Sequence, residues 1–249
     1  MTKIYEALEQ FDLERFNPEH ATATERSLVV PQVSKHDNAV SPELTETLIG
    51  LYRTIFTVVP GSCGRIIQFV ESGKGTGCSK VIRAFAKVSS SVLKKSVLLL
   101  DSDPQLPSNF DFFNQHSRLN WINEMQNNRD NNPAKSLRGQ DLLSVSRLSM
   151  EPGLLPVDLE PTQTEEFMGK LKQTFDLTLI DSWSVAIPPK PMLFSPHVDG
   201  VVLVIDAGKT RWQIAEKQKR ELVAQGGNVL GVILNNRTYP IPDSIYNRL

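Results

Sequence analysis

The feature that most constrains the fold of this chain is an alternation of short apolar segments with longer amphipathic ones. Apolar segments rich in Val, Ile and Leu, the composition of buried strands, occupy residues 66–71, 96–101, 142–146, 175–181, 199–208 and 229–236. Segments with helical periodicity occupy residues 41–56, 78–91, 164–174 and 211–225. Buried strands separated by helices of this length are typical of a parallel sheet covered on both sides. The sequence therefore predicts an α/β fold, with a mostly parallel sheet and helices on both of its faces.

The N-terminal part of the chain differs from the rest. Residues 2–15 have the apolar spacing of a short amphipathic helix, and residues 17–41 are polar, contain prolines and show no period. We therefore predict an N-terminal arm and linker over residues 1–40 and a single domain over residues 41–249.

Two details refine the prediction for the domain. Its first helix has Ser41 in the N-cap position and Pro42 at the first helical position, both favoured at a helix start. Residues from about 104 to 161 are less regular and rich in Asn and Ser, and we expect one or two short helices there, near residues 119–127.

The composition excludes several classes of protein. Among 249 residues, 40% are hydrophobic and 22% charged, and the net charge of −1 gives no general attraction to nucleic acid. Cys63 and Cys78 are too few for a disulfide framework, and the four histidines lack metal-ligand spacing. The chain starts without a signal-peptide pattern, and its apolar runs are too short to span a bilayer. We therefore expect a cytoplasmic protein, and if it works at a membrane, something else must hold it there.

A glycine-rich turn, "SGKGTGCS", joins the first long strand to the following helix. Its residues are Gly73, Lys74, Gly75, Thr76, Gly77, Cys78 and Ser79. A strand, a glycine-rich turn and a helix form the layout of a phosphate-binding loop, in which a lysine precedes the Ser or Thr that reaches the metal. Here Cys78 takes the place of that lysine.

Polar residues follow three other strands. Asp101 and Asp103 end one strand, Asp181 ends another, and Asn235 ends the last. In a parallel α/β sheet, ligands bind at the carboxyl ends of the strands. Carboxylates suit a magnesium ion, and an Asn side chain can hydrogen-bond the edge of a base, so these residues and the loop together predict a nucleotide site.

The order of these motifs resembles that of the bacterial tyrosine autokinases of exopolysaccharide and capsule assembly, in the P-loop branch of MinD- and ParA-type ATPases. The resemblance runs from residue 41 to the end, and the opening "KIYEAL" and closing "YPIPDSIYNRL" also look like exopolysaccharide-associated members. It implies the fold of the deviant Walker A branch, with nucleotide bound by the glycine-rich loop and Asn235. It further implies catalytic roles for Asp101 and Asp103, and a magnesium site made of Ser79, Asp103 and Asp181.

The chain also departs from the pattern of that family. Besides Cys78, Lys74 lies one position after the lysine that crosses the dimer in MinD-type proteins, and Gln105 stands where an arginine is usual. "DSWS" follows the third strand in place of an Asp-Thr/Ala-Pro-Pro sequence. The first helix keeps Arg53 but has Thr47 and Gly50 in place of the Glu and Arg of ring assembly.

The loss of the loop lysine has an energetic consequence. A charged hydrogen bond to phosphate contributes roughly 1.5–3 kcal/mol, so its loss weakens nucleotide binding by about 10- to 150-fold. Loss of one preorganised donor lowers a catalytic rate by about 10²–10³. The loop N–H groups and the helix N-terminus still attract phosphate. We therefore expect ATP and Mg²⁺ to bind weakly or not at all, and no other cofactor. The Cys78 thiol is either a small space-filling group or, with a lowered pKa, a reactive one.

The C-terminal tail lacks the tyrosine cluster that such kinases phosphorylate. Only Tyr239 and Tyr246 remain, and Pro240 and Pro242 stiffen the segment between them. We expect a docked tail with Tyr239 at least partly buried, and Tyr246 as the one phosphorylation candidate.

Three functions follow from these observations. The first is a degenerate kinase-like adaptor of polysaccharide export, docked on a membrane-embedded co-polymerase or chain-length regulator and forming a homo-oligomer. The second is an active tyrosine autokinase or ATPase in which Lys74 or another lysine serves the phosphates. The third is a positioning ATPase of the MinD or ParA type.

Overall fold

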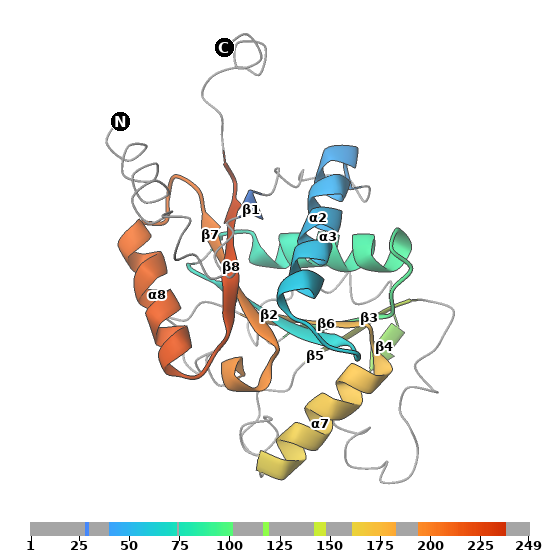
Figure 1. Cartoon of the computed structure of the whole chain (residues 1–249). Helices are drawn as coiled ribbons and strands as arrows, with labels where there is room; N and C mark the ends of the chain where they lie inside the picture. The colour runs from blue at the N-terminus through green and yellow to red at the C-terminus, as the bar shows by residue number, and fades with distance from the viewer. Residues whose placement is uncertain are drawn as a thin grey trace.

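Parallel strands form the centre of the structure, which is a computed structural model. It describes residues 28–29, 40–73, 75–101, 117–119, 142–147, 161–182 and 194–237. The strands of the described part are β1 (Leu28–Val29), β2 (Arg65–Glu71), β3 (Val97–Asp101), β4 (Ser117–Leu119), β5 (Leu143–Arg147), β6 (Leu177–Ser182), β7 (Gly200–Asp206) and β8 (Val229–Asn235). They form one sheet in the order β1-β8-β7-β2-β6-β3-β5-β4, and each neighbouring pair is parallel (Figure 1). The predicted α/β fold with a mostly parallel sheet is confirmed.

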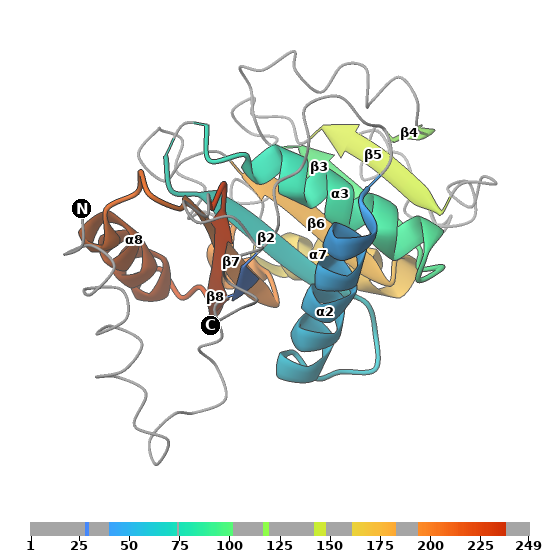
Figure 2. The same ribbon diagram turned by 90° about the horizontal axis from the view of Figure 1, so that it is seen from above.

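Helices cover both faces of this sheet (Figure 2). They are α2 (Pro42–Val58), α3 (Cys78–Ser91), α7 (Pro161–Thr174) and α8 (Trp212–Ala224), with a short 3₁₀ helix, η4, at Ser195–His197. Side chains of α2 and α3 pack into one apolar cluster, and side chains of α7 and α8 pack into a second. Along β2, Ile67 and Phe69 contribute to the first cluster and Ile66 and Val70 to the second, as the two-residue period of a strand requires.

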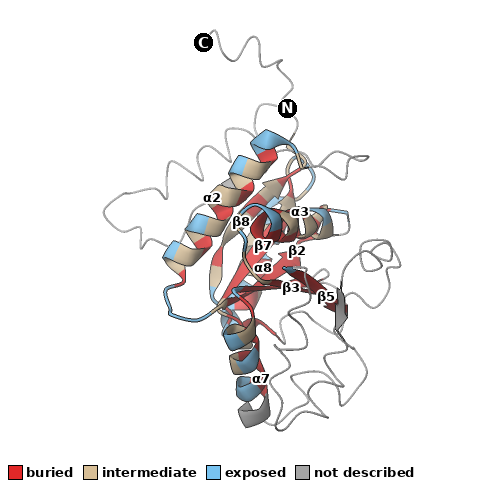
Figure 3. Ribbon diagram, turned by 90° about the vertical axis from the view of Figure 1, so that its right-hand side faces the viewer, coloured by how far each residue is buried: buried red, intermediate tan, exposed pale blue. Residues whose placement is uncertain are grey.

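The first helix shows how the sequence specifies one of these layers. Ser41 is extended and its hydroxyl accepts a hydrogen bond from the backbone N–H of Leu44 at 3.3 Å, while Pro42 begins α2 as predicted. Leu44, Leu48, Leu51 and Ile55 recur every three or four residues and are all buried. In Figure 3 this stripe is red along α2, and the opposite side of the helix is pale blue or tan.

Two short elements differ from the sequence prediction. Leu28 and Val29 pair with β8 inside the segment predicted to be an unstructured linker, so the sheet begins before residue 41. Leu119 ends β4, although we predicted one or two short helices near residues 119–127; residues 120–127 lie outside the described part. Both elements have three residues or fewer, a length at which periodicity is not recognisable. The domain boundary at residue 41 and the helix at residues 2–15 stay predictions, and the latter lies outside the described residues.

The strand order decides where a ligand can bind. The strand β2 lies between β7 and β6, and β6 lies between β2 and β3. All run in the same direction, so the loop after β2 meets the carboxyl ends of its neighbours at one edge of the sheet. In the register of β3 and β6, Asp101 pairs with Asp181, and in that of β7 and β8, Asp206 pairs with Asn235.

Candidate nucleotide site

The glycine-rich loop connects β2 to α3 directly. Gly75 and Gly77 both have φ of +80°, a left-handed conformation that glycine adopts without strain. A Cβ atom on Gly77 would lie 2.5 Å from the Nδ2 atom of Asn235, so the loop also approaches the end of β8 too closely for a larger residue. The predicted strand–turn–helix layout of a phosphate-binding loop is therefore present, with Cys78 as the first residue of the helix. Lys74 lies outside the described residues.

A carboxylate holds the middle of this loop. Oε1 of Glu71 accepts hydrogen bonds from the backbone N–H and the hydroxyl of Thr76, both at 2.9 Å. In a phosphate-binding loop, backbone N–H groups are the donors that hold the phosphate. Here an acidic side chain of the chain itself takes one of these donors.

The end of β8 fixes the other side of the loop. Nδ2 of Asn235 donates to the carbonyl oxygen of Thr76 at 2.7 Å. The Oδ1 atom of Asn235 is buried and has no hydrogen-bond partner among the described residues. Asn235 thus lies beside the loop, as predicted. Its unpaired oxygen is an acceptor of the kind that an amino group of a base can use.

Two carboxylates lie behind the loop. Asp101 and Asp181 are 1% and 6% exposed and are paired in the register of β3 and β6. Burial, followed by the negative charge of Asp101, raises the pKa of Asp181 from 3.8 to about 7, although a hydrogen bond from the Ser79 side chain lowers it. The structure therefore brings Ser79, Asp101 and Asp181 together as predicted.

Cys78 lies against this carboxylate pair. Its side chain is 3% exposed, and burial, with the negative charges of Asp181 and Glu71, raises the pKa of its thiol well above 9.0. The side chain is hydrogen-bonded to Asp181, an interaction that also favours the protonated thiol. Of the two interpretations of Cys78, the structure supports the space-filling group and not the reactive thiolate, because a nucleophilic cysteine needs a lowered pKa.

Arg83, on α3, is a residue of this site that the sequence analysis did not single out. Its Nε atom donates to the carbonyl oxygen of Ser79 at 2.9 Å, one helical turn earlier. Burial lowers the pKa of the guanidinium, and the charges of Asp181 and Asp101 oppose that effect. The available signal was its spacing from Ser79, because residues four apart on a helix share a face.

The described residues suit a phosphate group better than a divalent cation. A loop with N–H donors, close backbone approach at Gly77 and the unpaired oxygen of Asn235 are features of a nucleotide site. In contrast, Asp181 is hydrogen-bonded to Ser79 and Cys78, and the guanidinium of Arg83 lies within electrostatic reach. Within the described ranges, no three His, Cys, Asp or Glu side chains are placed to share a metal ion. Asp103, one of the three residues expected to hold Mg²⁺, lies outside the described part, so the magnesium site of Ser79, Asp103 and Asp181 stays a prediction.

Several predicted residues lie outside the described part of the chain. They are Lys74, Asp103, Tyr239 and Tyr246. Their expected roles, and the docked tail, stay predictions.

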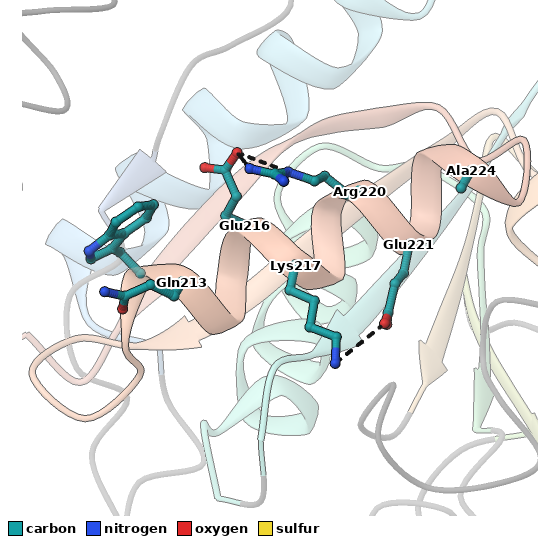
Figure 4. Close-up of a pocket in the computed structure, with 7 residues that line it drawn as sticks. Gln213, Glu216, Lys217, Arg220, Glu221 and Ala224 are labelled. Carbon is teal, nitrogen blue, oxygen red and sulfur yellow. Dashed lines mark hydrogen bonds and ion pairs between the residues drawn. The ribbon is translucent and has the colours of Figure 1, made fainter.

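A surface hollow of about 470 Å³ lies elsewhere, on the outer side of α8. Figure 4 shows that the described residues lining it belong to α8, with Arg220 paired to Glu216 at 2.8 Å and Lys217 to Glu221 at 3.8 Å. Because the cations of the described lining are paired with carboxylates, this part of the hollow does not favour an anion.

Comparison with known proteins gives a partial sequence match and a shared fold. No family model matches the chain. The tyrosine-protein kinase CpsD of Streptococcus agalactiae is 29% identical over 97 residues, which are 37% of this chain and 42% of that protein. The chain thus matches less than half the length of this curated relative.

Solved structures share the fold over most of the chain. The chimerical protein CapA2B2 has a TM-score of 0.65 at 20% identity, covering 86% of this chain and 96% of that one. The kinase domain of the Escherichia coli tyrosine kinase ETK has a TM-score of 0.61 at 14% identity, covering 90% and 95%. A ParA family ATPase from Chlorobium tepidum has a TM-score of 0.51 at 16% identity, covering 74% and 79%. The fold is that of the P-loop proteins of the ParA and MinD type, and the predicted resemblance to bacterial tyrosine kinases is confirmed.

No helix in the described part of the chain is long and apolar enough to cross a bilayer.

Proposed function

We propose that the chain is a degenerate, tyrosine-kinase-like P-loop protein that acts as a regulatory or adaptor component of exopolysaccharide or capsule assembly. The observation that carries this proposal is the position of Cys78. It begins α3 directly after the glycine-rich loop, where a phosphate-binding loop has its lysine, and its neutral thiol is buried beside Asp181. The loop therefore gains no positive charge from this position.

Glu71 weakens the site further. Its carboxylate accepts two hydrogen bonds from Thr76 and lies close enough to Cys78 and Asp181 to raise the pKa of both. A phosphate bound at the loop would meet this negative charge and would compete with it for the Thr76 N–H group. Missing positive charge and added negative charge both act against ATP, so we propose that the chain binds ATP weakly or not at all.

An adaptor acts by binding other proteins through its surface and does not need catalysis. We propose that the chain is cytoplasmic and docks at the inner membrane on a membrane-embedded co-polymerase or chain-length regulator, through its N-terminal arm or the face around the loop. A homo-oligomer is also part of this proposal. The matched kinase CpsD and the kinase-domain fold support this setting, because the proposed partner class is the one that the resemblance implies.

One observation favours an active enzyme instead. Asp101 and Asp181 are retained, adjacent and buried at the carboxyl ends of their strands. An active autokinase would use these carboxylates in every turnover, whereas an adaptor needs them only for stability.

The experiment that separates the two functions replaces Asp101 by Asn in the source organism. The adaptor proposal predicts that Asp101→Asn supports normal polysaccharide export, measured against a deletion strain and with the protein level checked by immunoblot. Cys78→Ala is the matched control, because it changes another buried residue of the same site without removing a carboxylate. A loss of export with Asp101→Asn alone, at an unchanged protein level, would establish catalysis and contradict the proposal.

A further inference from the structure

Asp101 and Asp181 place two acidic side chains next to each other in the interior of the protein. Both side chains are almost fully buried, and the two residues are direct neighbours in the register of β3 and β6. Two carboxylates in such a place repel each other and lose their hydration, so a buried pair needs a cation or a proton. In an active P-loop site a divalent metal ion supplies part of that positive charge.

Arg83 brings a positive charge of the chain itself to this place. It follows Ser79 by one helical turn, and side chains on a helix lean toward its N-terminus. At that end of α3, the Ser79 side chain is hydrogen-bonded to Asp181. The hydrogen bond from its Nε to the Ser79 carbonyl oxygen, at 2.9 Å, holds the guanidinium at that end of α3. The side chain is only partly accessible, and the negative charges of Asp181 and Asp101 stabilise its cation.

We propose that Arg83 is the resident cation of the Asp101–Asp181 pair and takes the place of a divalent metal ion there. The site is then metal-independent: Mg²⁺ and Mn²⁺ do not bind to the carboxylates. This inference rests on the proposed function, because it concerns the same degenerate site, but it concerns the cation and not the cellular role.

The test measures the thermal stability of the whole chain at pH 8.5, above the pKa of about 7 of Asp181, so that both carboxylates are ionised. It compares EDTA, Mg²⁺ and Mn²⁺ for the native protein, Arg83→Gln and Arg83→Lys. The native protein and Arg83→Lys are expected to melt at the same temperature in all three conditions. Arg83→Gln removes the charge and keeps most of the volume. It is expected to melt lower in EDTA and to recover with Mn²⁺, by about 3–6 °C at ten times the dissociation constant of the ion.

A matched control and a direct measurement complete the test. Arg220→Gln removes an exposed arginine that is paired with Glu216 on α8, and it is expected to show no response to Mn²⁺. Titration calorimetry with Mn²⁺ alone is expected to detect Mn²⁺ binding only for Arg83→Gln. A double variant, Arg83→Gln with Asp101→Asn, is expected to lose this Mn²⁺ binding.

Two results would overturn the inference. One is a rise in the melting temperature of the native protein with Mn²⁺, and the other is an Arg83→Gln variant that binds no Mn²⁺ by either method. If Arg83→Gln does not fold in EDTA, its refolding with Mn²⁺ but not with sodium chloride of equal ionic strength would support the inference, and failure in both would contradict it. None of these results depends on polysaccharide export, so the inference and the proposed function fail separately.

Discussion

The side-chain amide of Asn235 donates a hydrogen bond to the carbonyl oxygen of Thr76 at 2.7 Å, and joins the last residue of β8 to the glycine-rich loop. The two residues are 159 positions apart in the chain. This contact, together with the close approach of Gly77 to the same amide, joins the loop to the end of the sheet. Side chains of the protein itself therefore contribute to the shape of the site.

Removal of that contact is expected to lower stability. Asn235→Ala deletes a buried hydrogen bond to the loop, so the free energy of unfolding should fall by about 1–2 kcal/mol. Chemical denaturation measures the change. Asn228→Ala is the matched control, because it removes an exposed amide hydrogen bond to the Asp199 carbonyl oxygen. An equal loss in both variants would show that the contact with Thr76 has no special role.

The carboxylate of Glu71 is expected to oppose nucleotide binding. Glu71→Gln keeps an oxygen that can accept from Thr76 and removes the negative charge from the loop. The affinity for ATP and ADP should rise, by about tenfold for each 1.4 kcal/mol of repulsion removed. Calorimetric titration measures it, with Glu221→Gln on the outer side of α8 as control. An unchanged or lower affinity in Glu71→Gln would mean that this carboxylate does not compete with phosphate.

The two cysteines are expected to differ in reactivity. Cys63 is exposed, whereas Cys78 is buried and the pKa of its thiol is raised well above 9.0 by burial and by Asp181 and Glu71. Treatment of the folded protein with iodoacetamide at pH 8, followed by mass spectrometry, should label Cys63 and leave Cys78 unmodified. In denaturant both should react. Rapid labelling of Cys78 in the native protein would show that its thiol is accessible and ionised.

Asp181 is expected to make stability depend on pH. In the folded chain the pKa of Asp181 is raised to about 7, so its carboxyl keeps a proton up to that pH, whereas in the unfolded chain the proton leaves near 3.8. The folded state thus binds more protons between these values, and the contribution of Asp181 to stability falls as the pH rises from about 4 to about 7. Asp181→Asn removes this dependence.

Compared with the native protein, Asp181→Asn should therefore gain stability as the pH increases through this window, by an amount on the order of a few kcal/mol. Thermal melting at pH 5 and pH 8 measures the difference, and Asp199→Asn, far from the loop, serves as control for the general effect of a lost carboxylate. A stability difference that is the same at both pH values would contradict the raised pKa.

The sequence predicted most of the fold because its signals there are periodic. The apolar stripe of α2, the cap at Ser41 and the alternation of apolar strands with helices each predict an element and the side that it buries, and all three are present. The strands β1 and β4 were not predicted, because two or three residues are too few for an apolar period to be recognised.

The site was predicted only in part, for a physical reason. Residues at the ends of strands can be placed from the topology, so the loop, Asp101, Asp181 and Asn235 came together as expected. Interactions between side chains cannot be read from spacing alone. Thus the sequence did not indicate that the Glu71 carboxylate accepts a hydrogen bond from the backbone N–H of Thr76. Nor did it indicate that Arg83 lies within electrostatic reach of the two carboxylates.

The measurement that tests the central claim most directly is calorimetric titration of the native protein and Cys78→Lys with ATP and ADP, with and without Mg²⁺. A degenerate loop predicts weak or undetectable binding to the native protein. It also predicts binding that is about 10- to 150-fold tighter in Cys78→Lys, from the roughly 1.5–3 kcal/mol of a charged hydrogen bond. Cys78→Met, a larger side chain without charge, should not tighten binding. Low-micromolar affinity of the native protein for ATP, unchanged in Cys78→Lys, would contradict the account, because another cation would then complete the loop.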